Sequence, residues 1–532
     1  MGTSPKTFVR DATGLVRSLG FLDQFLMSQS IVNPVLGFVL TALYAPYFFP
    51  GAYLPLVFVL GSIPAFAMAY VYAIFSAGMP RSGGDYVWSS RIIGPAFAVV
   101  QMIMLLATTI ILGGAFASYA GISLLASQLF FALGVTTHNA SLLTGATSLT
   151  TISVGYPVDM LLIAICTGIL LLGLKGWMWV QRASFVLYYV VAAVFIGLLA
   201  FIGTSEGPTL FNNAMAFAGS TATYSSVISG AGSGGFSLSG FNAQSTVLAA
   251  IPWGFLTFTG FNYGTYLSGE TKSVKSNITK ALFLSAGISA VLLLGMSLLA
   301  YHDFGQSFLN AASYDVSTGA SLPAIPTVSL LLSLYNPLVA VLIGVSFIVV
   351  AQLNVMGDIL AMSRLFFAAS FDRVLPTKFA DVSERVHTPV FALLIIGVLW
   401  ALWVSALWFA GFASTFLNAG LVEIFGYGLP FVATALFYFI KPDLFKATVG
   451  AIAKPGPIIF ASIVAIVCFG FYGVAELFPI ASGVFLGASI VYAVGFLAIL
   501  VVIGLGLYGQ AVYRARRSGV DLRAVYAEIP PE

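Results

Sequence analysis

The chain has 532 residues, of which 59% are hydrophobic and only 7% are charged, and its formal net charge is +3. Soluble domains carry about 25% charged residues, so this composition excludes a water-soluble enzyme. The mean hydropathy of +1.02, together with 54 glycines and 23 prolines, is typical of apolar helices with breaks, which membrane spans tolerate. The small net charge gives no support for binding to nucleic acid.

The apolar stretches are long enough to cross a membrane. A hydrocarbon core of about 30 Å requires roughly 20 consecutive apolar residues in a helix, and twelve stretches of the chain approach or exceed this length. We therefore predict an all-α polytopic membrane protein with 12 transmembrane helices. In chain order the spans are 21–49, 53–78, 95–131, 158–174, 179–203, 247–269, 278–301, 329–362, 388–411, 413–440, 456–480 and 483–511.

The distribution of basic residues tests this count, because lysine and arginine concentrate in cytoplasmic loops. All 21 lie in the two termini or in every second loop, and the opposite set of connections, which includes 132–157, 204–246 and 302–328, contains none. One missed span would have scrambled this pattern. We therefore predict a multi-pass protein of the plasma membrane, with cytoplasmic tails at 1–20 and 512–532.

The predicted extracellular connection 204–246 is rich in Gly, Ser, Thr and Asn. Its Gly230-Ala231-Gly232-Ser233-Gly234-Gly235 segment matches the letters of a dinucleotide-binding fingerprint. That fingerprint requires a strand before it, a helix after it and an acidic residue downstream. We expect instead a flexible loop, and no nucleotide cofactor.

Two spans contain residues that interrupt a helix. In the first span, Pro34 offers no N–H to the Ser30 carbonyl, and in the sixth span Pro252 similarly frees the Leu248 carbonyl. Glycines, Gly260 among them, further weaken the sixth span. Within a bilayer such breaks usually mark a cavity or a ligand site, although a proline kink that packing relieves is the plainer interpretation of either proline alone.

The first and sixth spans correspond if the chain contains two five-span halves, at 21–203 and 247–440, followed by two further helices at 456–511. An odd number of spans per half inverts the second half, and paired broken helices then point to a transport site at the membrane midplane. Exposed N–H groups suit a carboxylate, and exposed carbonyls suit an ammonium group or a metal cation. The predicted substrate-binding residues are Ser28, Gln29, Ser30, Ile31, Val32, Asn33, Thr257, Phe258, Thr259, Gly260, Phe261 and Asn262, with Phe261 closing over the substrate.

Three motifs carry a resemblance to a known family. They are Pro80-Arg81-Ser82-Gly83-Gly84-Asp85-Tyr86-Val87 through Arg91 and Gly94-Pro95 after the second span, Gly260 followed by Gly269-Glu270-Thr271-Lys272 in and after the sixth, and Ser363-Arg364 with Phe371-Asp372-Arg373-Val374-Leu375-Pro376 after the eighth. With these motifs the chain resembles the amino acid, polyamine and organocation (APC) transporter superfamily, and the resemblance implies the inverted five-plus-five repeat of the LeuT-type fold. The chain departs from the family in its first span, where Ser28, Ser30 and Asn33-Pro34 replace a Gly-rich break. It also departs in its fifth span, where Tyr188 stands in place of a lysine.

Acidic and amide side chains at depth are candidates for ion coupling. Asn354 and Asp358 are four residues apart on one helix face of the eighth span, and Glu423 lies about 15 Å along the tenth. They could bind a proton, which we prefer, or sodium. The alternative for Asp358 is a structural pair with Arg364. The two cysteines and three histidines lie far apart, so we predict neither a disulfide framework nor a metal site.

We therefore predict a secondary active transporter, not an enzyme, that imports an amino acid or related organic amine by alternating access and needs no cofactor beyond its coupling ion. No basic residue lies in the middle of a span, which favours zwitterionic or cationic substrates. The alternative function with the same fold is a polyamine or organocation carrier, or an amino-acid exchanger. A receptor or a partner-dependent subunit is the alternative from a different class.

Overall fold

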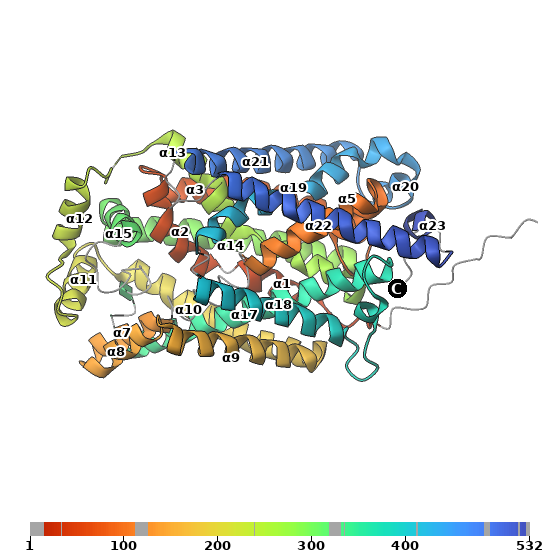
Figure 1. The fold of residues 1–532 in the computed structure, drawn as a ribbon. Helices are drawn as coiled ribbons and strands as arrows, with labels where there is room; N and C mark the ends of the chain where they lie inside the picture. Colours follow the sequence, from red (N-terminus) through yellow and green to blue (C-terminus); the bar gives the residue numbers. More distant parts are fainter. Residues whose placement is uncertain are drawn as a thin grey trace, which may run out of the picture.

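The computed structural model describes residues 15–32, 34–111, 126–238, 240–318, 331–332, 334, 336–410, 413–482, 490–519 and 522–527. Throughout these residues the regular elements are helices, and most of them run lengthwise through an elongated bundle (Figure 1). Ten helices are long and apolar enough to cross a membrane. The prediction of an all-α polytopic membrane protein is confirmed.

The helices of the N-terminal part are α1 Phe21–Val32, α2 Pro34–Phe48, α3 Leu54–Gly78, α4 Asp85–Ile92, α5 Pro95–Thr108, α7 Ser127–Thr136, α8 Ala140–Ser148, α9 Ile152–Leu171 and α10 Leu174–Phe201. The middle part contains α11 Glu206–Phe217, α12 Tyr224–Ser233, α13 Ala243–Ala249, η3 Ala250–Phe255, η4 Leu256–Phe258, η5 Phe261–Glu270, α14 Val274–Phe304 and α15 Gln306–Thr318. The C-terminal part contains α17 Pro337–Phe371, η6 Thr377–Ala380, α18 Val390–Ala410, α19 Ala413–Ile440, α20 Pro442–Ala447, η7 Val449–Ala451, α21 Pro455–Ser482, α22 Ile490–Arg517 and α23 Leu522–Ala527.

Ten of the twelve predicted spans correspond to these long apolar helices, counting α1 and α2 together as one span. The third predicted span is represented by the shorter apolar helices Pro95–Ile111 and Ser127–Thr136, with 112–125 outside the described residues. The sixth is divided among α13, η3, η4 and η5. The count of twelve and the inverted repeat stay predictions.

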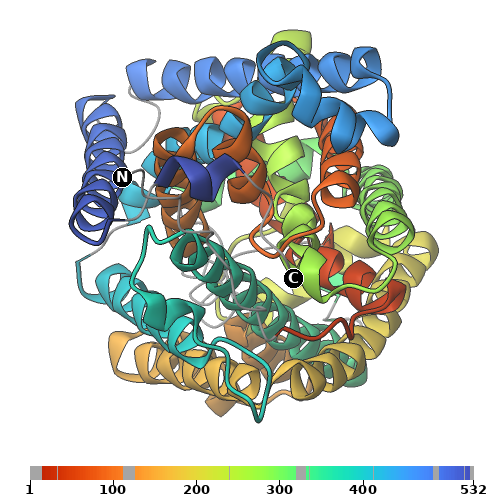
Figure 2. The ribbon, with the colours of Figure 1, turned by 90° about the vertical axis from the view of Figure 1, so that its right-hand side faces the viewer.

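Burial separates an inner helix from peripheral ones. In the first span, α1 and α2 together, 82% of the most apolar 18-residue window is buried inside the protein, compared with 28% in α9 and 17% in α22. Figure 2 shows α9 and α22 at the rim of the bundle. Many apolar side chains of the outer helices are therefore exposed on the outside of the bundle. In a membrane protein this surface faces lipid.

The two ends of the bundle differ. Helices α11, α12 and α15 lie at one end, and α20 and α23 lie at the other, which we call the basic end because it carries the basic segment after α19 and the arginines that close α22 (Figure 1). The connection 204–246, expected to be flexible, contains α11, α12 and the start of α13. Its fingerprint-like glycines close α12, where Gly235 adopts a φ of +78°.

Candidate functional site

The sixth span is interrupted at Thr259 and Gly260. The π-helix η3 surrounds Pro252 and leads into η4, and the chain then becomes extended at Thr259, with φ −61° and ψ 146°. Gly260 follows in the left-handed region at φ +86° and begins η5. This conformation disfavours any residue with a Cβ, so a glycine is needed at the break. The predicted interruption at Gly260 is present.

The break lies against the first span. A Cβ at Gly260 would overlap Ile31 Cγ2, so the Ile31 side chain occupies the space that the glycine leaves. Two further glycines make similar contacts between the spans: Gly37 of α2 lies against Thr257, and Gly264 of η5 lies against Gln24. The two spans therefore pack with their backbones close together around the break.

Helix α17 completes this region. Its Asn354 donates from Nδ2 to the Ile31 carbonyl at 3.1 Å, and a Cβ at Gly357 would lie 2.9 Å from Ser30 Oγ. Beyond Asn33, the Val35 N–H of α2 donates over 3.5 Å to the hydroxyl of Tyr188 in α10. Side chains from two other helices thus bond to main-chain groups on both sides of Asn33, which itself lies outside the described residues.

The predicted substrate residues do not all face the break. Gln29 points to α14, where its Nε2 donates to the Ser285 carbonyl at 2.9 Å and to Ser289 Oγ at 3.1 Å. The hydroxyls of Ser30, Thr257 and Thr259 donate to carbonyls three residues earlier in their own segments. Such bonds use the hydroxyl hydrogen locally and leave only acceptor capacity for a ligand.

The remaining residues of this set are buried. Val32, Phe258, Phe261 and Asn262 expose 4% or less of their surface. Ser28 Oγ is buried and has no hydrogen-bond partner within the described residues. Since buried polar groups are normally paired, Ser28 is a polar group with capacity for a ligand.

The three predicted coupling residues have different surroundings. Both carboxylate oxygens of Asp358 are buried without a hydrogen-bond partner in the described part of the chain, as is Asn354 Oδ1. Glu423 of α19 accepts a hydrogen bond from Tyr472 at 3.3 Å. The alternative pair between Asp358 and Arg364 is not formed, because Arg364 binds Glu270. Asp358 therefore has the capacity to bind a cation.

A chain of hydroxyls next to this region was not predicted as a unit. Tyr427 of α19 donates to the Tyr263 hydroxyl of η5 at 2.6 Å. The Tyr263 hydroxyl lies 2.7 Å from Thr109 Oγ1, which donates to the Leu105 carbonyl at 2.8 Å. Because each hydroxyl has one hydrogen, the donation runs from Tyr427 through Tyr263 to Thr109. Tyrosines spaced within apolar spans were the only sequence signal for it.

The three sequence motifs meet at the basic end. Arg91 of α4 binds Asp372 through two hydrogen bonds, one of them 2.8 Å long. Arg364 of α17 binds Glu270 of η5 through bonds of 2.8 and 3.0 Å, and both side chains are fully buried. Paired bonds of this geometry fix both position and orientation. The end of the broken sixth span is thereby fastened to α17.

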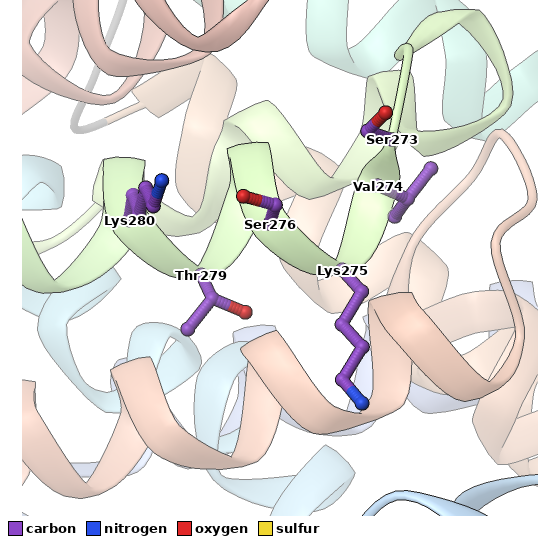
Figure 3. Close-up of a pocket in the computed structure, with 6 residues that line it drawn as sticks. All are labelled: Ser273, Val274, Lys275, Ser276, Thr279 and Lys280. Carbon is purple, nitrogen blue, oxygen red and sulfur yellow. The ribbon is translucent and has the colours of Figure 1, made fainter.

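The described part of the chain also has a surface pocket at the start of α14. Its lining residues come from this one segment, and none is a predicted substrate or coupling residue (Figure 3). They are Ser273, Val274, Lys275, Ser276, Thr279 and Lys280. The pocket is therefore separate from the candidate site.

These features define a polytopic membrane protein with an interrupted helix in its bundle and, beside the interruption, buried polar groups that have no hydrogen-bond partner among the described residues. The model of the amino acid permease family matches residues 19–505. The chain belongs to this family, and the predicted membership of the APC superfamily is confirmed. Its family identifies it as a transporter of amino acids or related compounds. No match to a curated protein was found.

Proposed function

We propose that the protein imports an amino acid or a related organic amine by alternating access, with the substrate held between the first and sixth spans. The observation that carries this proposal is the break at Thr259–Gly260, which packs against Ile31 in the most buried span of the bundle. An interrupted helix presents free N–H and carbonyl groups that can bind the two charged ends of an amino acid.

The contacts at Asn33 support the same location. Ile31 and Val35 direct main-chain polar groups toward side chains of α17 and α10 instead of lipid. Irregular backbone at membrane depth is tolerated only where protein or a polar cavity surrounds it. In this proposal the substrate carboxylate binds the N–H groups after Gly260, and its ammonium group binds carbonyls near the Ser28–Val32 segment.

Asp358 is the proposed coupling group. Asp358 directly follows Gly357, which packs against Ser30 and Ile31. Its carboxylate has no hydrogen-bond partner among the described residues. A carboxylate in this position can bind a proton and release it as the site changes access. Glu423, which Tyr472 contacts, is the second proposed proton site, and Asn354 Oδ1 would be an oxygen ligand if sodium replaced the proton.

A carrier for diamines or other organocations is the second candidate. Asp358, which has no hydrogen-bond partner in the described part of the chain, favours it because a carboxylate is a counter-charge for an ammonium group. Uptake by the purified chain in liposomes distinguishes the two. Labelled amino acids and diamines would be offered separately, with and without an inward proton gradient. Gradient-stimulated uptake of an amino acid that diamines do not inhibit supports the first proposal, and the reverse pattern supports the second.

A matched variant makes this test specific to the site. Ser28→Ala removes a buried hydroxyl that has no hydrogen-bond partner among the described residues, so it should weaken substrate binding without disturbing another of their contacts. Ser62→Ala removes a hydroxyl on α3 that donates to the Val59 carbonyl of its own helix and serves as the control. Equal uptake by both variants and the unaltered protein would exclude Ser28 from the site.

A further inference from the structure

Asp85 is the first residue of α4, and its side chain is completely buried. Its Oδ2 accepts a hydrogen bond from the hydroxyl of Tyr72 in α3 at 2.6 Å, and its Oδ1 accepts one from the hydroxyl of Tyr266 in η5 at 2.7 Å. One carboxylate therefore joins three elements: α3, α4 and the part of the sixth span that follows the break.

The glycines before Asp85 make this junction possible. Gly83 and Gly84 have φ values of +104° and +53°. A Cβ at Gly83 would overlap Ala368 of α17, and one at Gly84 would lie 3.2 Å from the Tyr266 ring. The Gly83 N–H donates to the Tyr266 carbonyl at 3.0 Å. Tyr266 is thus held by its backbone and by its hydroxyl, so η5 cannot leave α4 without breaking both bonds.

The cations and acids around α4 belong to other pairs. Arg91, on the same helix, binds Asp372, and Lys441 at the end of α19 donates to the Arg91 carbonyl at 2.8 Å. On α17, Arg364 binds Glu270. Further tyrosines lie nearby: Tyr86 of α4 contacts Tyr526 of α23 through their hydroxyls at 3.4 Å, and the Tyr263 ring of η5 packs edge-on against Tyr266.

Asp85 lies between the apolar helices α3 and α5, and its side-chain partners among the described residues are the hydroxyls of Tyr72 and Tyr266. Burial, which disfavours a charged carboxylate, raises the pKa of Asp85 to about 6, although the hydrogen bonds from Tyr72 and Tyr266 oppose this shift. A carboxylate open to water has a pKa of about 3.9. The proton affinity of Asp85 therefore depends on whether the junction is closed.

We propose that Asp85 is a proton-binding site of the basic end, which binds a proton more tightly while η5 packs on α3 and α4 than when η5 separates and water reaches the carboxyl group. The inference rests on the proposed function, because it assumes that this end opens during transport. A proton favours the state that binds it more tightly, so acid on this side keeps the junction closed.

The size of the pH effect on opening follows from the proton affinities of Asp85 in the closed and the open junction. The ratio of open to closed protein should fall about tenfold between pH 7 and pH 5, and it should change little above pH 7. Asp85→Asn keeps a polar side chain of similar size that cannot ionise. This variant should behave as permanently protonated, with a closed junction and no response to pH over this range.

The proton site is tested directly by infrared titration of the full chain in lipid. Protonated carboxyl groups give a distinct C=O band, and its growth on acidification reports proton binding without any transport. We expect a component with a midpoint near pH 6 that Asp85→Asn abolishes. Asp381→Asn, at an exposed position between η6 and α18, is the control and should retain it. A component that survives in Asp85→Asn, or that is absent from the unaltered protein, overturns the proposal.

The Tyr266→Phe variant distinguishes a proton-binding role of Asp85 from a purely structural one. This change removes one donor to the ionised carboxylate, so the midpoint of the same component should move to higher pH. An unchanged midpoint in folded Tyr266→Phe protein would contradict the proposal. A structural role alone predicts lower stability in both variants but no movement of a titration midpoint.

Release of labelled substrate from liposomes then tests the link to opening. With the pH varied on the side of the basic end, the unaltered protein and Asp381→Asn should slow about tenfold from pH 7 to pH 5, and Asp85→Asn should be slow at both values. Transport with the same pH response in Asp85→Asn overturns the inference and leaves the proposed function standing. No transport of any offered substrate, with the infrared component present, overturns the proposed function and supports the proton site.

Discussion

The Ile31 side chain fills the space beside Gly260 where any other residue would place its Cβ. The two residues are 229 positions apart in the chain, and their contact brings the break of the sixth span against the end of α1. The left-handed φ of +86° at Gly260 and this close approach both require a glycine. Any other residue at position 260 would strain the backbone at the break and push the two spans apart.

Gly260→Ala should abolish transport while leaving a folded protein. The left-handed conformation costs a residue with a Cβ about 1–2 kcal/mol, and the added methyl group also meets Ile31. Uptake in liposomes and thermal unfolding of the detergent-purified protein measure the two effects. Gly287→Ala in α14 is the control, because a Cβ there meets no atom within 4 Å.

A second change separates overlap from backbone strain. Ile31→Ala removes the side chain that the new methyl group meets, so the Gly260→Ala/Ile31→Ala protein should be more stable than the two single effects added together. Strict additivity of the two changes in unfolding free energy would mean that the Ile31 contact contributes nothing.

Asp358→Asn should uncouple transport from the proton gradient. The amide cannot take up or release a proton, whereas its size and burial match those of the aspartate. Uptake of the accepted substrate should then be the same with and without a pH step. Glu423→Gln provides the comparison within the same protein, and a full response to the pH step in both variants would rule out these two carboxylates as coupling groups.

Removing either member of the Arg364–Glu270 pair should lower the stability of the protein. Both side chains are fully buried, so Arg364→Met or Glu270→Gln alone leaves an uncompensated group and should destabilise the protein by about 3–5 kcal/mol. Arg364→Met combined with Glu270→Leu removes both charges and should cost less than either single change. Unfolding by heat or denaturant gives the comparison, and a double variant as unstable as the sum would argue against a coupled pair.

Stability should depend on pH through Asp85. Because burial raises the pKa of this residue to about 6, the folded state binds its proton more tightly than the unfolded chain does. This contribution to stability is complete below about pH 4 and is lost as the pH rises through 6, a total of about 3 kcal/mol. Unfolding of the unaltered protein and Asp85→Asn from pH 4 to pH 7.5 should therefore diverge in favour of the variant. Parallel curves would show that Asp85 stays in one protonation state.

The direction of donation in the hydroxyl chain predicts that losing its first donor costs less stability than losing an acceptor further along. Tyr427→Phe removes only the first donor and leaves Tyr263 bonded to Thr109, so it should destabilise the protein by about 1 kcal/mol. Thr109→Val leaves the Tyr263 hydroxyl without its acceptor and should cost more. A double-variant cycle of Tyr427→Phe and Thr109→Val measures their coupling through Tyr263, and a coupling energy of zero would contradict a connected chain.

The sequence by itself determined the class of fold and one break. Runs of apolar residues indicate membrane spans because lipid offers no hydrogen-bond partner to an unpaired backbone. Gly260 marked the interruption because glycine alone among residues adopts a left-handed conformation without penalty. Motif letters such as those around Gly83 and Glu270 identified the family, which the match over residues 19–505 confirms. All of these signals are local in the chain.

Only the tertiary structure decided which polar groups are free and which are paired. Gln29 was predicted to line the site, and the structure adds that its amide nitrogen bonds to α14. Arg364 was a possible partner of Asp358, and it binds Glu270. Asp85 is surrounded by tyrosines from α3 and η5, which lie far from it in sequence. Side-chain pairing between distant segments depends on how the helices pack, and helix periodicity alone does not specify that packing.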